Sequence, residues 1–333
     1  GGFDQELWRE ISELGWVGAV LPEEFGGAGL GYVDLCVIAE ELGRANTALP
    51  FSSSVYLVSE ALLRYGTREQ AQTWLPKLAA GEIIGAFATA EGNGAVSPGW
   101  IKTRVSGGAM TGTKRPVTDA GEADLLIVAA HDENGFGLYL VETSDAGVSR
   151  TPLEMNDGSR PAATVVFDGA AAQPLNISDG WAALENLQDR AAVLMAFEQI
   201  GGAQACLDMA RDFALERYAF GRPIGSFQAI KHKLADVYIA IELARSNAYY
   251  GAWALHADAA ELPVAAAAAR VAASRAFDLA SKENIQTHGG MGYTWEIDCH
   301  LYYRRAKALG LALGSAKLWK DRLVSRLEAR NTL

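Results

Sequence analysis

The chain has 333 residues, enough for about two domains, and half of them are hydrophobic. This composition excludes a disordered chain, a collagen-like fibre and a small disulfide-rich scaffold. The net charge of −11, from 40 acidic and 29 basic residues, predicts no nucleic-acid partner. Three cysteines far apart in the chain, without CxxC spacing, predict free thiols in a reducing compartment, which we take to be the cytoplasm: Cys36, Cys206 and Cys299.

The chain gives no signal of a membrane span or a metal site. It contains no uncharged apolar run of roughly 18 residues, so we expect no transmembrane helix. Its five histidines do not pair with one another or with cysteines at a ligand spacing, so we expect no metal. The chain begins at Gly1-Gly2 without a Met or a signal peptide, and we therefore expect some native N-terminal residues to be absent.

Residues 1–84 predict an N-terminal helical domain. A first helix is indicated near Phe3 by apolar residues at helical spacing, which are Leu7, Ile11, Leu14 and Trp16. Further helices are predicted over 33–42 and 53–65. Thr67 followed by Gln70 three residues later forms a predicted capping box for another helix that ends before Gly81.

Residues 85–176 predict a central antiparallel β domain. Short apolar runs over 83–89, 125–130, 137–141 and 163–167 are separated by Gly, Asn and Asp, which are turn residues. From 177 to 333 the pattern becomes helical again, over 181–218, 227–256, 263–286 and from 298 to the end. Short loops between such long helices favour a four-helix bundle, and the predicted fold class is α+β.

Two loops between the predicted bundle helices combine residues that suit a ligand. In the segment 216–228, Arg217, Phe220 and Gln228 lie across a Gly/Pro helix break, and a guanidinium matches phosphate while an amide suits a ribose or adenine edge. In the segment 286–296, Gln286 is followed by Gly289 and Gly290, which let a ligand approach the backbone. Each segment alone is also typical of an ordinary helix–helix turn, but their pairing on consecutive hairpins favours an anion site.

These segments resemble the acyl-CoA dehydrogenases, FAD-containing flavoproteins of fatty-acid and lipid degradation that desaturate acyl-CoA thioesters between Cα and Cβ. The resemblance rests on R-x-x-F-G-x-P-I-x-x-F-Q from Arg217, on Q-x-x-G-G-x-G from Gln286, on the loop 21–29, and on the helical–β–helical order. It implies the dehydrogenase-like fold, FAD as cofactor, an acyl-CoA substrate and electron-transfer flavoprotein as electron acceptor. It also implies a homo- or hetero-oligomer, because FAD is held mainly by the neighbouring subunit.

The resemblance also implies which residues contact FAD. Arg217, Phe220 and Gln228 would contact its adenosine diphosphate half, and Gln286, Gly289 and Gly290 would complete that pocket. In the β domain, Thr89 would line the isoalloxazine and Thr118 would lie near flavin N5, although Pro116 stands where relatives carry a Trp.

The usual catalytic base of this family is missing. Most members carry a Glu six residues after a lysine, and counting from Lys307 gives Leu313, which cannot accept a proton. Some relatives place the base on the helix before the Arg217 motif, as an acid next to an arginine. Asp189 is therefore our candidate base, with Arg190 toward the CoA or thioester, although an ungapped alignment puts the position at Ala191. The alternative interpretation of Asp189 is a helix-start residue that complements the macrodipole.

The sequence leaves three functions open. The first is an α,β-desaturating acyl-CoA dehydrogenase that uses Asp189. The second is a non-catalytic subunit that pairs with a competent one on steroid-like or dicarboxylic acyl-CoA. The third is an oxidase or monooxygenase built on the same fold.

Overall fold

The computed structural model describes residues 3–331, which fall into two compact units. The first unit contains Gly1–Leu35 and Ala48–Ala191, and the second contains Cys36–Thr47 and Ala192–Leu333. Interpretations that concern Gly1-Gly2 or the last two residues lie outside the described part of the chain. The predicted boundaries at 84/85 and 176/177 follow changes of secondary structure, and as domain limits they stay predictions. No helix within residues 3–331 has the length and apolar character that crossing a membrane requires.

The N-terminal helices form where the sequence predicts them, with two corrections. Helix α1 (Gln5–Glu13) is capped by Asp4, whose Oδ1 accepts from the Leu7 amide at 3.0 Å. The helix ends before Leu14 and Trp16, because Gly15 takes a left-handed φ of 77°. Leu14 is consequently 68% exposed rather than part of the core.

Four further helical elements and a π-helix follow α1 in the sequence. Their bounds are η1 (Glu23–Phe25), α2 (Tyr32–Arg44), the π-helix η2 (Ser52–Ser59), α3 (Glu60–Tyr65) and α4 (Arg68–Ala79). The capping box of α4 is confirmed, with Thr67 Oγ1 accepting from the Gln70 amide at 3.1 Å and Gln70 Oε1 from the Thr67 amide at 2.9 Å. The segment predicted as one helix over 53–65 begins instead as a π-helix whose eight residues are all buried.

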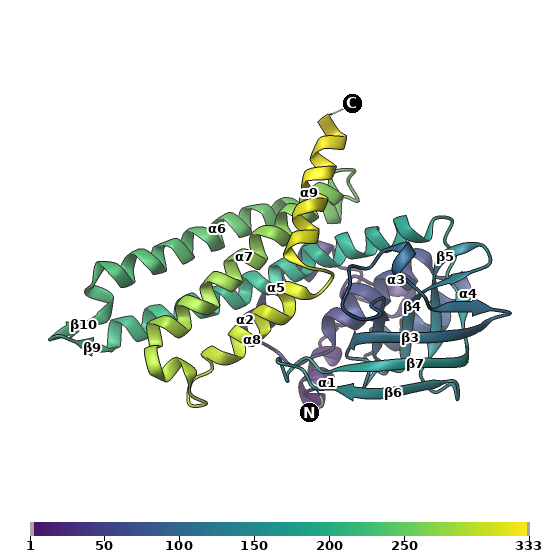
Figure 1. Cartoon of the computed structure of the whole chain (residues 1–333), viewed down its shortest axis with the longest axis horizontal. Helices are drawn as coiled ribbons and strands as arrows, with labels where there is room; N and C mark the ends of the chain where they lie inside the picture. Colours follow the sequence, from purple (N-terminus) through teal and green to yellow (C-terminus); the bar gives the residue numbers. More distant parts are fainter. Residues whose placement is uncertain (1–2, 332–333) are drawn as a thin grey trace. The chain divides into compact units, whose positions relative to one another are not determined.

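The central β domain forms one mixed sheet with the strand order β6-β7-β3-β2-β4-β5-β8, and β1 also pairs with β4 (Figure 1). The strands are β1 (Gly85–Ala88), β2 (Arg104–Ser106), β3 (Ala109–Thr118), β4 (Leu125–Asp132), β5 (Gly135–Glu142), β6 (Val148–Leu153), β7 (Ala162–Ala171) and β8 (Gln173–Pro174), with η3 (Pro98–Trp100) before β2. Most pairs are antiparallel as predicted. The pairings β1–β4 and β2–β4 are parallel, because long connections bring both strands back beside β4.

The core of the first unit lies between this sheet and the helices. Strand β4 is buried on both faces from Leu125 to Ala130, which explains its unbroken apolar run. The cluster around it draws residues from η2, α3, α4, β5 and the start of α5: Val58, Leu62, Leu75, Leu78, Leu138, Leu140 and Leu187.

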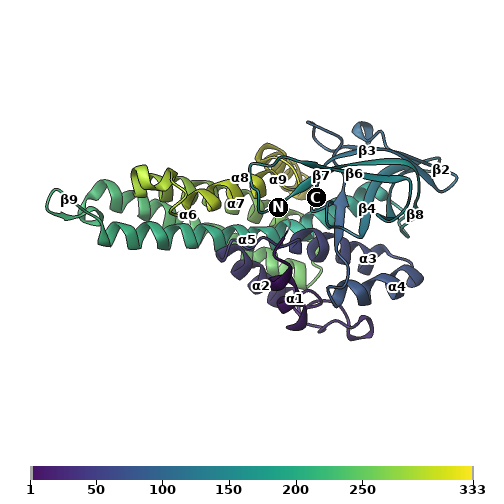
Figure 2. The same cartoon turned by 90° about the horizontal axis from the view of Figure 1, so that it is seen from below.

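The second unit consists mainly of long helices (Figure 2). They are α5 (Gly180–Glu216), α6 (Gln228–His256), α7 (Leu262–His288), α8 (Cys299–Leu311) and α9 (Ala316–Asn331), with the hairpin β9 (Tyr218–Ala219) and β10 (Arg222–Pro223) and the short helices η4 (Ile224–Ser226) and η5 (Gly289–Tyr293). Helix α7 packs against α6, α8 and α9, and its alanines allow these close approaches. Residues up to Ala191 of α5 belong to the first unit.

The predicted α+β fold class is confirmed, but the last predicted helix is not continuous. It breaks after Leu311, where Leu313 and Gly314 take left-handed φ values of 61° and 108°. The guanidinium of Arg270 on α7 donates to the carbonyl oxygens of Leu309 and Ala312 and so satisfies the end of α8. The fourth member of the predicted bundle is therefore two helices, α8 and α9.

Candidate functional site: a pocket at the ends of α5 and α7

The segment after α5 forms a tight hairpin that fixes the backbone of Arg217. Phe220 and Gly221 occupy its two-residue turn with φ values of 54° and 80°, as a type I′ turn requires. The Arg217 amide donates to the Phe213 carbonyl at 2.8 Å, and the Ile224 amide donates to the Arg217 carbonyl at 2.7 Å. Phe220 is left at the tip with 95% of its surface exposed.

The segment after α7 forms the facing turn. Gly289 ends the helix with a φ of 61°, and a Cβ built on Gly290 would meet nothing within 4 Å. His288 lies beneath the turn, where its ring stacks on Phe213 with centroids 4.2 Å apart. Thr294 closes the turn by donating from its amide and its hydroxyl to the Met291 carbonyl at 3.0 and 2.8 Å.

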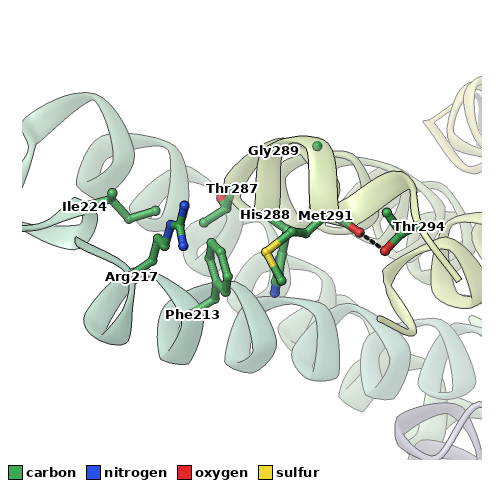
Figure 3. Close-up of a pocket in the computed structure, with 9 residues that line it drawn as sticks. Phe213, Arg217, Ile224, Thr287, His288, Gly289, Met291 and Thr294 are labelled. Atoms are coloured by element: carbon green, nitrogen blue, oxygen red, sulfur yellow. Dashed lines mark hydrogen bonds between the residues drawn. The ribbon is translucent and has the colours of Figure 1, made fainter. Parts of the chain in front are cut away.

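Residues of these two turns line a pocket of about 530 Å³ that is open to solvent (Figure 3). Figure 3 shows Arg217 and Thr287 directed toward each other across its mouth. The lining residues come from both motifs: Phe213, Arg217, Ile224, Thr287, His288, Gly289, Gly290, Met291 and Thr294. The predicted residues Arg217, Gly289 and Gly290 are thus brought together, although about 70 residues of sequence separate the motifs.

The other predicted residues of these motifs do not line the pocket. Gln228 is the first residue of α6, Gln286 lies in the last turn of α7, and both are exposed, as is Phe220. Sequence reasoning missed the apolar lining residues Phe213, Ile224 and Met291. The only feature of the sequence that could have indicated these three residues is that each lies within four residues of a predicted FAD contact.

The pocket suits a phosphate-bearing cofactor with an aromatic part. Within residues 3–331 the exposed Arg217 guanidinium makes no ion pair, so its charge is available to an anion. The uncovered backbone at Gly290 leaves room that a side chain would fill. Phe213, Ile224 and Met291 supply an apolar wall, and the described chain holds no cluster of His, Cys, Asp or Glu suited to a metal.

The two predicted flavin threonines lie in the first unit. Thr89 follows β1, and Thr118 is the last residue of β3, and both are half-buried. A backbone hydrogen bond links the segment after β1 to strand β3. In it, the Arg115 amide donates to the Ala90 carbonyl at 2.7 Å. The structure therefore places Thr89 and Thr118 on neighbouring segments of one sheet.

A buried ion pair supports the same segments. Lys114 Nζ lies 2.8 Å from Glu91 Oε1, and both side chains are almost fully buried. Glu91 also accepts from the Thr103 hydroxyl at 2.6 Å and the Lys102 amide at 2.6 Å. Burial alone would raise the pKa of Glu91, but the bonds from Lys114, Thr103 and Lys102 together lower it to about 2. Glu91 is consequently ionised at neutral pH.

The candidate base Asp189 and its neighbour Arg190 are both buried, with 2% and 1% of their surfaces exposed. The helix-start interpretation of Asp189 is wrong, because α5 begins at Gly180 and Asp189 lies well beyond its first turn. The helix is regular throughout, so Asp189 and Ala191 point about 200° apart.

Arg190 is engaged within the first unit. Its Nε forms an ion pair with Glu60 Oε1, and its guanidinium lies 4.7 Å from the centre of the Tyr32 ring. The Tyr32 hydroxyl donates to Glu60 Oε2 at 2.7 Å, and burial together with the Glu60 charge raises the pKa of Tyr32 to about 12. Contact of Arg190 with CoA stays a prediction.

Comparisons with known proteins identify the class. A family model described as Acyl-CoA dehydrogenase, C-terminal domain matches residues 178–327, and one described as Acyl-CoA dehydrogenase, N-terminal domain matches residues 1–82. The chain belongs to the acyl-CoA dehydrogenase family. It is an oxidoreductase that acts on CH–CH groups of acyl-CoA, and its cofactor is FAD, as predicted.

Individual relatives and solved structures agree with this class. The chain is 35% identical to the acyl-CoA dehydrogenase IpdE2 of Mycobacterium tuberculosis, over 98% of this chain and 87% of that protein. It is 32% identical to a mitochondrial isovaleryl-CoA dehydrogenase of Solanum tuberosum, over 95% of this chain and 80% of that one.

Two solved structures are similar along almost the whole chain. A variant of the Tcur3481–Tcur3483 steroid ACAD has a TM-score of 0.91 and 32% identity, covering 99% of this chain and 90% of that one. The ChsE4–ChsE5 complex of Mycobacterium tuberculosis has a TM-score of 0.90 and 29% identity, covering 98% and 88%.

Proposed function

We propose that this chain desaturates an acyl-CoA thioester between Cα and Cβ, with Asp189 as the base and electron-transfer flavoprotein as the electron acceptor. The observation that carries the proposal is the pocket lined by Arg217, Gly289 and Gly290, because its guanidinium and open backbone suit the phosphates of FAD, the cofactor of the family to which the chain belongs. Arg217, Gly289 and Gly290 would hold FAD, which would supply the acceptor for the β-hydride when bound. The chain's own part is to hold the cofactor and to remove the α-proton.

A carboxylate is needed for that proton transfer. The residue at the family's usual position, Leu313, has an aliphatic side chain in the turn between α8 and α9. Asp189 is an acid on α5, the helix where some relatives carry their base, and it stands beside Arg190, which Glu60 holds in place. Asp189 is our candidate for these reasons.

A second candidate function is a FAD-pocket subunit without its own base, which works with a competent partner chain on a bulky acyl-CoA such as a steroid or dicarboxylic thioester. The burial of Asp189 favours this candidate, because a base must reach the substrate. The similarity to a steroid ACAD and to a complex of two different chains supports it further. Association with a second copy or with such a partner, and a cytoplasmic location, stay predictions.

The decisive experiment is to express the chain alone, load it with FAD and follow bleaching of the flavin absorbance by a panel of acyl-CoA thioesters. Bleaching by the wild type, lost in Asp189→Asn while FAD stays bound, supports the first function. The matched control is Asp179→Asn at the start of the same helix, where either residue caps equally well. Full activity of Asp189→Asn would overturn the assignment of the base, and bleaching only after co-expression with a partner dehydrogenase chain would establish the second function.

A further inference from the structure

Directly after Thr118, the chain makes a strained and heavily supported turn. Asp119 takes a left-handed φ of 61°, a conformation that Asp and Asn tolerate better than most residues. It is 2% exposed, and its amide donates to the Pro161 carbonyl at 2.8 Å. Thr118 itself pairs with Ala162 at the start of β7. The backbone of Thr118 is thus tied to the segment that leads into β7.

The carboxylate of Asp119 adds a second, buried attachment. Its Oδ2 accepts from Arg160 Nη2 at 2.9 Å and from the Ser53 hydroxyl at 2.5 Å. Arg160 Nη2 also donates to the Ser52 hydroxyl at 2.7 Å, and Arg160 is 8% exposed. One carboxylate therefore joins the end of β3, the segment before β7 and the π-helix η2.

The π-helix makes this attachment unusual. Turns of π-helix are rare and occur frequently at functional sites. In η2 the helix presents Ser52 and Ser53 to the ion pair, and Ser54 accepts from the Gly85 amide at 3.2 Å at the start of β1. The element thus contacts both the strand before Thr89 and the turn after Thr118.

We propose that the Asp119–Arg160 pair, fastened to η2 by Ser52 and Ser53, is a positioning device that sets the Thr118 hydroxyl against the flavin. The proposal rests on the proposed function and on the family resemblance, which implies that Thr118 would lie near flavin N5. A buried, charge-assisted pair with further hydrogen bonds holds its geometry more rigidly than a solvated turn does. Asp119 and Arg160 act through Thr118 and touch neither substrate nor cofactor in this scheme.

Substitution of Asp119 by Asn tests the device, because Asn keeps the size and the left-handed backbone but removes the negative charge and one acceptor oxygen. In the FAD-loaded enzyme we expect Asp119→Asn to retain FAD, to shift the flavin absorbance bands, and to lower kcat about 10- to 100-fold with KM little changed. Arg160→Lys should retain more activity than Arg160→Met. Ser53→Ala, which removes a single bond to Asp119, should change the spectrum in the same direction by less.

The controls separate this inference from the proposed function. Asp132→Asn, in the β4–β5 turn of the same sheet, removes a carboxylate that accepts from the Asn134 amide at 2.7 Å, and it should leave spectrum and kcat unchanged. If the wild type is bleached by acyl-CoA and Asp119→Asn matches it in spectrum and kcat, the positioning role is refuted while the function stands. If the wild type takes up FAD but no acyl-CoA bleaches it, the proposed function fails, and the spectra of Asp119→Asn and Ser53→Ala still test the positioning of the flavin. Should Asp119→Asn fail to fold, Ser53→Ala decides by the same readouts.

Discussion

Gly43 of α2 and Gly201 of α5 lie at one helix crossing, each against a backbone carbonyl of the other helix. A Cβ on Gly43 would overlap the Glu198 carbonyl oxygen, and a Cβ on Gly201 would overlap the Glu40 carbonyl oxygen. Such reciprocal contact brings two helix backbones closer than side chains would allow. Glu40 is bound there by Arg245 of α6 at 2.6 Å, so three helices meet around this crossing.

We therefore expect Gly201→Ala to lower the free energy of unfolding by about 1–3 kcal/mol or more, because the added methyl forces the helices apart. Urea denaturation followed by circular dichroism measures the change. Gly310→Ala in α8 is the matched control, since its Cβ would meet nothing within 4 Å and Ala is the better helix former. Equal stability of Gly201→Ala and Gly310→Ala would contradict the close crossing.

The Glu91–Lys114 pair predicts a dependence of stability on pH. The folded pKa of Glu91, about 2, lies below its ordinary value of 4.5. Between about pH 4.5 and pH 2, Glu91 is therefore mostly protonated in the unfolded chain but still ionised in the folded chain. This contribution to stability is fully present above about pH 4.5 and is lost as the pH falls toward 2.

The melting temperature of the wild type should consequently fall more steeply between about pH 5 and pH 3 than that of Glu91→Gln. Glu82→Gln, at an exposed position just before β1, should show the wild-type slope. Parallel curves for the wild type and Glu91→Gln would argue against the depressed pKa.

The capping box of α4 is expected to make a measurable contribution to the free energy of unfolding. Thr67→Ala removes the hydroxyl that accepts from the Gln70 amide, and we expect a loss of about 1 kcal/mol in the free energy of unfolding. Thr73→Ala on the same helix is the control, because the Thr73 hydroxyl only donates to the Glu69 carbonyl on an exposed face. Thermal unfolding should rank Thr67→Ala as clearly less stable than Thr73→Ala, and the reverse order would contradict the cap.

The pocket predicts which arginine of the hairpin recognises FAD. Removing the Arg217 guanidinium should weaken FAD binding about 10- to 100-fold, the usual effect of losing a hydrogen bond to a charged group. Titration of the FAD-free chain with FAD, followed by flavin fluorescence, measures this. Arg222→Ala is the matched control, since Arg222 lies over the Phe227 ring at 4.2 Å and does not line the pocket. If both variants bind FAD equally, the pocket is not the FAD site.

Much of the fold could be predicted because its signals are local. The Thr67–Gln70 cap and the Gly/Pro break after Arg217 involve residues within a few positions of each other, and the structure has both. Periodicity missed the break between α8 and α9, where Leu313 and Gly314 take left-handed φ values. No local pattern reveals that Arg270, about 40 positions earlier, satisfies the carbonyl of Leu309 at the end of α8.

The family resemblance, the two motifs and the missing carboxylate at Leu313 can be recognised in the sequence, since they depend on which residues are present and how they are spaced. That Arg217 and Gly290 line one pocket, and that Arg190 pairs with Glu60, emerges only from the folded chain. The physical reason is that burial and ion pairing are set by residues distant in the chain, whose approach no local pattern encodes.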